Sequence, residues 1–301
     1  GNLDYLLSAS LKFSIGLRWE DWEADYSDSL NELFNPADKM SGGKISLIKS
    51  MTNETNIYAS LAKGYKQGGF NLGLGLDANS TNQNLAYDPE FLTNYELGIN
   101  TKLLDSKINF NGVIFYSYRE DQQVLISTQT DPSDPNTFSF LTQNAAEGVN
   151  HGLEINMDID IRESLSAFLN LGMLKTEIKN WQSRQDLEGR AQAHAPEKSY
   201  ALGLNWAPTS DTYLAIDFTG KSSFYYSDSH NNKSKSYVLT NLNLGYVKNN
   251  WSYELWARNV FDEYYSVRGF YFGNEAPNFI DTLYERHGDP RNIGFSIRYD
   301  F

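Results

Sequence analysis

Apolar and polar residues alternate with a period of two along most of this chain, and this pattern constrains the fold more than any other feature of the sequence. Every odd position from Leu11 to Trp19 is apolar, and every even position between them is polar or glycine. The final segment, 293–301, repeats the pattern. Successive side chains of a strand point to opposite faces of a sheet, whereas a helix would scatter these positions around its circumference. The sequence therefore predicts strands with one apolar and one polar face.

Turn-forming residues divide the chain into about twelve such strands. The predicted strands are residues 7–26, 39–50, 56–65, 90–104, 108–127, 144–161, 165–178, 196–207, 212–225, 236–248, 251–260 and 290–301. Short connections such as 105–107 alternate with long polar connections such as 66–89. Outer-membrane barrels have tight periplasmic turns and long outer loops, which gives the same alternation. We therefore expect an all-β, antiparallel, up-and-down transmembrane β-barrel with every long loop on one side.

The composition agrees with a barrel and excludes other classes. The mean hydropathy is −0.53, and the chain has no uninterrupted run of about 18 apolar residues, as a membrane-spanning helix would need. A barrel is compatible with this value, because its lipid-facing and lumen-facing residues alternate. The net charge of −13 argues against nucleic acid as a partner. The absence of cysteine fits an oxidising compartment.

Aromatic residues gather near the ends of the predicted strands, as in the interfacial girdle of a membrane barrel. The pairs and triplets concerned are Trp19 and Trp22, Tyr116 and Tyr118, and Trp251, Tyr253 and Trp256. The chain ends on Phe301, which falls on the apolar face of the last strand. Outer-membrane barrels usually end in this way, so we expect Phe301 to resemble the signal that the barrel-assembly machinery reads.

Four short motifs accompany the alternation. Residues 64–71 read GYKQGGFN, residues 259–265 read NVFDEYY, and the strands contain YELG at 95–98 and GLE at 152–154. Together they resemble the G-Y-K-x-G-G-F-N, N-[LV]-F-D-x-x-Y, Y-E-x-G and G-x-E elements of TonB-dependent receptors. Glycines 68 and 69 are expected to permit unusual backbone conformations, and Glu96 and Glu154 are expected on the lumen face.

The resemblance implies a barrel of about 22 strands whose lumen is filled by an N-terminal plug. It also implies an outer-membrane active transporter of a Gram-negative bacterium, energised by the TonB–ExbB–ExbD complex. The expected ligand is a ferric siderophore, followed by haem, cobalamin or an oligosaccharide, and lipid and lipopolysaccharide are the expected surroundings. Residues 1–301 would then be the C-terminal part of the barrel domain, without the plug and without the segment that contacts TonB.

Two segments have the composition of a binding surface. Tyrosine and arginine offer large contact areas with hydrogen-bonding tips, and arginine can bind an anionic ferric complex through two parallel hydrogen bonds. The candidate ligand-binding residues are Tyr65, Lys66, Gln67, Phe70, Tyr264, Tyr265, Arg268, Tyr271 and Phe272. The simpler interpretation is that these aromatics form the interfacial girdle or stiffen a loop.

Other classes of function remain open alternatives. A complete twelve-stranded barrel could be a phospholipase, which needs a Ser–His pair near the outer rim, or an autotransporter pore, which needs a helix through the barrel. A passive porin would show clustered Arg and Lys on one wall. The sequence contains no G-x-S-x-G motif, and its four histidines are far apart and mostly in or beside long loops. We therefore expect neither an enzyme nor a resident cofactor or metal.

Two structural expectations follow from a partial barrel. Ile155 and Leu204 should face lipid, while Asn156 and Asn205 should face the lumen. The edge strands, expected to be those containing Leu11 and Phe295, should not pair with each other. Unpaired backbone groups in hydrocarbon cost several kcal/mol each, so these edges must meet other strands.

Overall fold

The computed structural model describes residues 1–27, 33–71, 86–129, 138–181 and 184–301. Strands make up nearly all of the regular structure in these residues, with a single 3-10 turn at Gln185–Leu187. No helix among them is long and apolar enough to cross a membrane. The main sheet contains β1 (Asn2–Ser8), β2 (Leu11–Glu23), β5 (Ala37–Ser50), β6 (Thr55–Lys66), β9 (Glu90–Leu103), β10 (Ile108–Gln129), β11 (Phe138–Arg162), β12 (Leu165–Asn180), β13 (Lys198–Thr209), β14 (Thr212–Lys221), β15 (Tyr237–Lys248), β16 (Trp251–Arg258) and β19 (Asn292–Tyr299).

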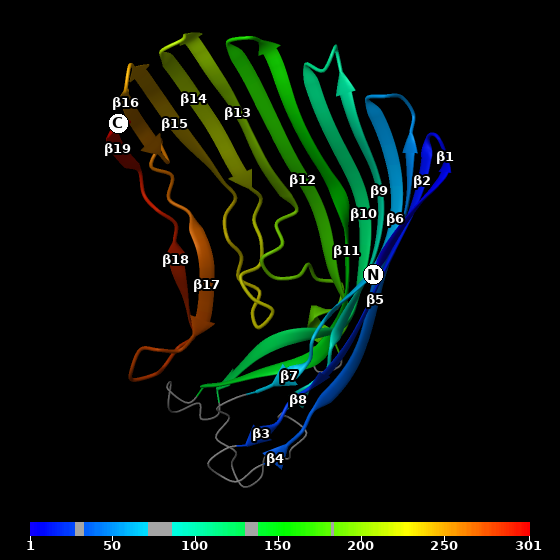
Figure 1. Cartoon of the computed structure of the whole chain (residues 1–301). Helices are drawn as coiled ribbons and strands as arrows, with labels where there is room; N and C mark the ends of the chain where they lie inside the picture. The colour runs from blue at the N-terminus through cyan, green and yellow to red at the C-terminus, as the bar shows by residue number, and fades with distance from the viewer. Residues whose placement is uncertain (28–32, 72–85, 130–137, 182–183) are drawn as a thin grey trace.

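Each strand of this sheet pairs antiparallel with its neighbour along the chain, in the order β1-β2-β5-β6-β9-β10-β11-β12-β13-β14-β15-β16-β19. Figure 1 shows the sheet as a curved wall, with the short turns at the top and the long connections at the bottom. Three small hairpins lie in the long connections: β3 (Tyr26–Ser27) with β4 (Leu33–Phe34), β7 (Gly69–Phe70) with β8 (Ala86–Tyr87), and β17 (Ser266–Phe272) with β18 (Thr282–His287). The predicted up-and-down topology with one-sided long loops is confirmed.

The prediction of a single first strand over residues 7–26 is wrong, because this stretch contains a turn. β1 and β2 form a hairpin that turns between Ser8 and Leu11, and Asn2 pairs with Gly16. The turn has the sequence Ser-Ala-Ser, without the glycine or proline that usually marks a hairpin. The sheet therefore has 13 strands rather than twelve, and its first edge is β1, not the strand that contains Leu11.

The odd number of strands determines how the sheet can close. In an antiparallel meander of 13 strands, the first and last strands run in the same direction. They could not complete an all-antiparallel ring, and single-chain bacterial barrels have even numbers of strands. Within the described residues no pairing joins β1 to β19. The barrel is not closed, and the alternative of a complete twelve-stranded barrel is not favoured.

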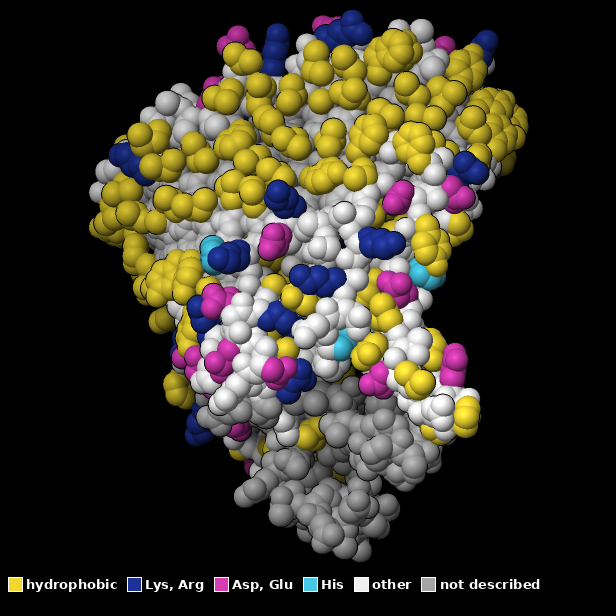
Figure 2. Space-filling model, turned by 180° about the vertical axis from the view of Figure 1, so that it is seen from behind, with side chains coloured by type: hydrophobic (Ala, Val, Ile, Leu, Met, Phe, Trp, Pro, Cys, Tyr) yellow, Lys and Arg dark blue, Asp and Glu magenta, His cyan; other side chains and the backbone are white. Residues whose placement is uncertain are grey.

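The two faces of the sheet differ in chemistry as expected. Ile155 stands in register with Leu171, and Leu204 stands in register with Ile216. Exposed apolar side chains from successive strands form a continuous band on the convex face, which Figure 2 shows from behind Figure 1. On the opposite face Asn156 donates to Asn111 at 3.5 Å. This division of faces is that of a membrane barrel with a polar lumen.

The aromatic girdle is present but does not include every predicted residue. Trp251 stacks on Tyr253 with ring centroids 6.2 Å apart, and Tyr299 lies 4.8 Å from Trp251. Trp256 departs from the prediction. It is the cross-strand partner of Gly294, and a Cβ atom on Gly294 would lie 2.0 Å from the indole ring. The Trp256 ring therefore fills the space over a glycine on the polar face and does not face lipid.

A small apolar core lies at the long-loop end of the sheet, beyond the membrane band. Its buried members are Val124, Ala146, Ile178, Trp181 and Leu187. Trp181 and Leu187 belong to the connection between β12 and β13, so this core packs that connection against the extended ends of β10, β11 and β12. The long strands therefore provide a rigid base for the loops above the membrane.

Candidate ligand-binding surface

The two predicted binding segments lie at the long-loop end of the sheet but on different sides of it. Figure 1 shows β7 toward the bottom centre and the β17–β18 hairpin at the left. The structure therefore places both segments at the same end of the barrel wall, the long-loop end, which we call the mouth.

Tyr65 and Phe70 of the first segment are held by the N-terminal side of the wall. The Tyr65 hydroxyl donates to a carboxylate oxygen of Glu20 at 2.8 Å, and the Arg18 guanidinium lies 5.6 Å from the Tyr65 ring. The Phe70 ring lies 6.3 Å from Trp22. These contacts connect β6 and β7 to β2, as the scaffold interpretation of these aromatics expects.

Gln67 and Asn71 connect the same segment to β10 and β11. The Gln123 amide donates to the Gln67 carbonyl at 2.8 Å. The Asn71 amide nitrogen donates to the Thr142 carbonyl at 2.9 Å, and the Thr142 amide donates back to Asn71 Oδ1 at 2.7 Å. The side chain of Asn71 therefore pairs with β11 as another strand would. Lys66 and the side chain of Gln67 remain exposed at the mouth.

The structure gives a different reason for the glycines of the G-G-F-N element than the sequence did. Of the described glycines only Gly189 has a positive φ, so unusual backbone conformation does not explain Gly68. A Cβ atom on Gly68 would lie 2.6 Å from both Asp38 Oδ2 and the Tyr87 carbonyl. Gly68 is needed because a side chain and a backbone segment approach it closely, not because of its φ angle.

The N-V-F-D element has the bend that the sequence predicted. Asn259 and Asp262 have φ angles of 48° and 55°. The Glu263 amide donates to Asn259 Oδ1 at 2.8 Å, and the Asn259 amide donates back to the Glu263 carbonyl at 2.9 Å. The Arg291 amide donates to Asp262 at 2.7 Å. This bend ends β16 and turns the chain toward β17.

The second segment forms the β17–β18 hairpin, which packs on the loop between β14 and β15. Gly269 lies against Tyr226, where a Cβ atom would be 2.3 Å from the ring. The Tyr226 hydroxyl donates to Glu285 of β18. Burial and this hydrogen bond raise the pKa of Tyr226 to about 12. Tyr226 therefore remains a neutral hydrogen-bond donor that anchors the hairpin.

The predicted residues of this hairpin have different surroundings. The Tyr265 ring packs 4.6 Å from Tyr237 of the sheet. Tyr271 lies 5.7 Å from the His230 ring, and the exposed guanidinium of Arg268 lies 4.8 Å from the Phe270 ring. Phe272 contacts Tyr284 of β18 with ring centroids 5.2 Å apart. Tyr265 and Phe272 therefore fix the hairpin, whereas Arg268 and Tyr271 remain available at the mouth.

A second arginine stands directly beside Arg268. Arg286 of β18 is its cross-strand partner, and both residues are exposed. Like charges directly opposite each other destabilise a strand pair, and an anion held between them would relieve this repulsion. Arg286 was not predicted from the sequence, because the antiparallel register of an unpredicted hairpin creates the pair.

Between the hairpin segment and the sheet, the concave face contains a hollow of 590 Å³. Its walls include Glu154 and Lys221 of the sheet, and Tyr265 and Val267 lie at its hairpin side. The hollow therefore opens on the concave, polar side of the wall. Among the described residues no group of three or more His, Cys, Asp or Glu could hold a metal ion.

A Ser–His contact, which the phospholipase alternative requires, occurs on the same hairpin. Ser266 Oγ lies 3.1 Å from His287 Nδ1, and the Tyr264 hydroxyl lies 2.5 Å from His287 Nε2. In a Ser-His-Asp triad a carboxylate accepts from the histidine nitrogen that does not face the serine, and here the Tyr264 hydroxyl occupies that place. His287 therefore contacts both Tyr264 and Ser266 without the carboxylate of that triad.

Two histidines that the sequence analysis left as ordinary loop residues lie beside the hairpin. Partial desolvation lowers the pKa of His194, although the residue keeps part of its surface exposed, and the nearby Arg268 adds to this effect. Burial also lowers the pKa of His230. Both are therefore neutral at pH 7 and surround the base of the hairpin without adding charge.

These histidines predict a loss of loop stability in acid. The pKa of each histidine is lower in the folded loop than in the unfolded segment, so the unfolded segment takes up protons more readily as the pH falls. The stability of the folded loop therefore decreases once the pH drops below about 6.5. We expect hydrogen-exchange protection of residues 190–194 and 224–234 to decrease between about pH 7.5 and about pH 5.5. The variant His194→Asn/His230→Asn should lack most of this decrease, and asparagine tolerates the positive φ of His194. An equal decrease in both proteins would contradict this assignment.

Residues 1–260 match a family model described as TonB dependent receptor-like, beta-barrel. Among curated proteins, the chain is 23% identical over 269 residues to the pesticin receptor of Yersinia pestis, covering 86% of this chain and 36% of that receptor. It is 22% identical over 265 residues to the metal-pseudopaline receptor CntO of Pseudomonas aeruginosa, covering 86% of this chain and 33% of that receptor.

Solved structures have the same fold. The ferric yersiniabactin uptake receptor FyuA of Yersinia pestis superposes with a TM-score of 0.79 at 17% identity, covering all of this chain and 44% of that one. The siderophore receptor PiuA of Acinetobacter baumannii gives a TM-score of 0.76 at 19% identity, covering 98% of this chain and 42% of that one. The chain thus spans between a third and a half of these relatives. With a family model that matches most of its length, the chain belongs to the TonB-dependent receptor β-barrel family.

Proposed function

We propose that the protein containing this chain is an active importer of an anionic ferric siderophore, and that residues 1–301 are the C-terminal part of its barrel. At the family level the chain is an outer-membrane receptor of a Gram-negative bacterium and not an enzyme. Relatives named for ferric siderophores support the choice of ligand. Its partners would be the TonB–ExbB–ExbD complex, lipopolysaccharide, and the barrel-assembly machinery through Phe301.

The observation that carries this proposal is the arginine pair on the β17–β18 hairpin. Arg268 and Arg286 are exposed direct neighbours, and Tyr264 and Tyr271 on the same hairpin are also exposed. Two guanidinium groups with adjacent phenols offer charge-assisted hydrogen bonds to the carboxylates, phenolates or hydroxamates of a ferric complex. The segment with Tyr65, Lys66, Gln67 and Phe70 would form the facing part of the mouth.

The proposal is tested with the full-length receptor in cells that lack their own siderophore. Uptake of iron-55 is measured with a panel of purified ferric siderophores, in the presence and absence of TonB. We expect uptake of at least one anionic complex to require both the receptor and TonB. Uptake that continues without TonB would contradict active import and would favour a passive pore.

Binding to that same complex then tests the residues. Arg268→Ala or Tyr271→Ala should weaken affinity by about tenfold or more, about 1.4 kcal/mol, because each removes a contact that holds the anion. Arg298→Ala removes an arginine that pairs with Asp300 at the opposite end of the wall, so it should leave affinity unchanged. Surface expression is checked for each variant. Unchanged affinity in both hairpin variants would make these residues scaffold and would place the site elsewhere.

A further inference from the structure

A row of side chains on the convex face changes from aliphatic to basic as it crosses five strands. Leu61, Tyr95, Tyr116, His151 and Lys175 are successive cross-strand partners on β6, β9, β10, β11 and β12. The Tyr95 and Tyr116 rings lie 6.4 Å apart, and Tyr116 stacks on His151 at 6.3 Å. The row therefore joins an apolar surface to a positive one through a continuous aromatic platform.

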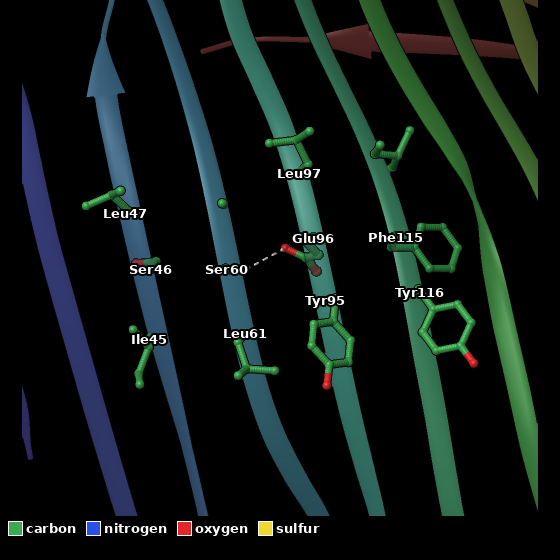
Figure 3. Close-up of a pocket in the computed structure, with 12 residues that line it drawn as sticks. Ile45, Ser46, Leu47, Ser60, Leu61, Tyr95, Glu96, Leu97, Phe115 and Tyr116 are labelled. Atoms are coloured by element: carbon green, nitrogen blue, oxygen red, sulfur yellow. Dashed lines mark hydrogen bonds between the residues drawn. The ribbon is translucent and has the colours of Figure 1, made fainter.

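The aliphatic end of this row borders a hollow in the membrane-facing surface. Ala59 stands between the cross-strand partners Leu47 and Leu97, and its small side chain leaves a depression of 550 Å³. Figure 3 shows Leu47 and Leu97 in the upper part of this depression, with Leu61 and the Tyr95 and Tyr116 rings in a row below them. Its lining is almost entirely apolar, which suits a hydrocarbon chain.

The basic end lies where the apolar band stops on the long-loop side. Along β12 the exposed Met173 is followed on the same face by Lys175, and the cross-strand partner of Met173 is Lys198. Among the described residues no carboxylate lies within 4.0 Å of Lys175 or Lys198. The nearby Glu177 instead pairs with Lys179 at 2.6 Å. Glu177 also interacts electrostatically with Lys175, but its ion pair is with Lys179. Lys175 and Lys198 therefore face the headgroup layer without forming an ion pair of their own in the described part of the chain.

We infer that this surface binds one lipopolysaccharide molecule of the outer leaflet, with an acyl chain in the Ala59 hollow and a phosphate on Lys175 and Lys198. The long loops mark the outer side of the membrane, so these lysines meet the leaflet that carries phosphorylated glycolipid. Tyr116 and Lys175 are two strands apart, about 10 Å, a span that a diglucosamine headgroup covers. The tyrosine platform contacts the sugar rings. The inference is independent of the imported ligand.

The test is the amount of lipopolysaccharide that remains on the full-length receptor after purification from outer membranes and exchange into fresh detergent, measured by mass spectrometry. Lys175→Gln/Lys198→Gln should retain about tenfold less than the wild type, because each lysine near the headgroups contributes an electrostatic attraction. Lys175→Arg/Lys198→Arg should retain wild-type amounts. The matched control Lys107→Gln/Lys248→Gln removes the same charge at the short-turn side and should also retain wild-type amounts.

Two further arms separate the parts of the inference. Ala59→Leu fills the hollow and should reduce retention, whereas Ala62→Leu, on the other face of β6, should not. The wild type should bind dephosphorylated lipopolysaccharide more weakly than the intact form. Three results would each overturn the inference. The first is equal retention of lipopolysaccharide by Lys175→Gln/Lys198→Gln and Lys107→Gln/Lys248→Gln, and the second is equal binding of intact and dephosphorylated lipopolysaccharide. The third is retention of glycerophospholipid in place of lipopolysaccharide.

Discussion

Replacing Arg190 by alanine is expected to release the loop between β14 and β15 from the loop between β12 and β13. The Arg190 side chain is only 8% exposed and lies 2.8 Å from Asp228. Its other nitrogen donates to the Asn231 side chain at 2.8 Å and to the His230 carbonyl at 3.1 Å. The guanidinium also lies 4.4 Å from the Tyr225 ring. One side chain therefore bonds to several acceptors of the loop between β14 and β15.

The expected cost is large because removing Arg190 leaves the Asp228 carboxylate, which is only 21% exposed, without its counter-ion. Breaking a buried pair by deleting one partner costs about 3–5 kcal/mol, since the other charge is left uncompensated. Hydrogen exchange of residues 222–236 in the full-length receptor should accelerate accordingly. Arg190→Lys should recover only part of the loss, because an ammonium cannot reproduce the planar fork.

Arg184 provides the matched control for this prediction. It belongs to the same connection and pairs with Asp186 at 2.9 Å, but Asp186 is 60% exposed. Exposed pairs contribute about 0–1 kcal/mol, so Arg184→Ala should change the exchange of residues 222–236 little. Similar exchange in the Arg184 and Arg190 variants would show that the two loops are held together by other contacts.

A charge on the convex face should destabilise the barrel in the membrane. Leu204 is 45% exposed in the apolar band, and an arginine near the middle of the bilayer costs about 2–4 kcal/mol on the lipid face of a barrel. We therefore expect Leu204→Arg to lower the free energy of unfolding in lipid vesicles by this amount, measured by guanidinium titration. Asn205→Arg changes the next residue, on the polar face, and should cost clearly less. Equal losses would contradict the assignment of the two faces.

The fold was predictable from the sequence wherever one residue pattern decides it. Alternation and loop length gave the strand order, the division of faces and the one-sided loops, because a strand sorts its side chains locally. The β1–β2 hairpin was missed because its Ser-Ala-Ser turn carries no strong turn residue. The β17–β18 hairpin was missed because its strands are short and lie inside a long polar connection.

The candidate site was predictable only in its composition. Arg268 and Tyr271 were identified because arginine and tyrosine cluster along the chain. Their neighbours Arg286, His194 and Tyr226 come from other segments, and only the packing of the hairpin on the loop brings them together. Contacts of this kind depend on tertiary structure, and no local pattern in one sequence records them.

Cryo-electron microscopy of the protein isolated from native outer membranes tests most directly whether these 13 strands are one wall of a larger, plugged barrel. We predict that β1 and β19 each hydrogen-bond to strands from outside residues 1–301, because free edges in hydrocarbon cost several kcal/mol per unpaired group. A folded plug should fill the concave side of the wall. Direct pairing of β1 with β19, or an empty lumen, would contradict the account.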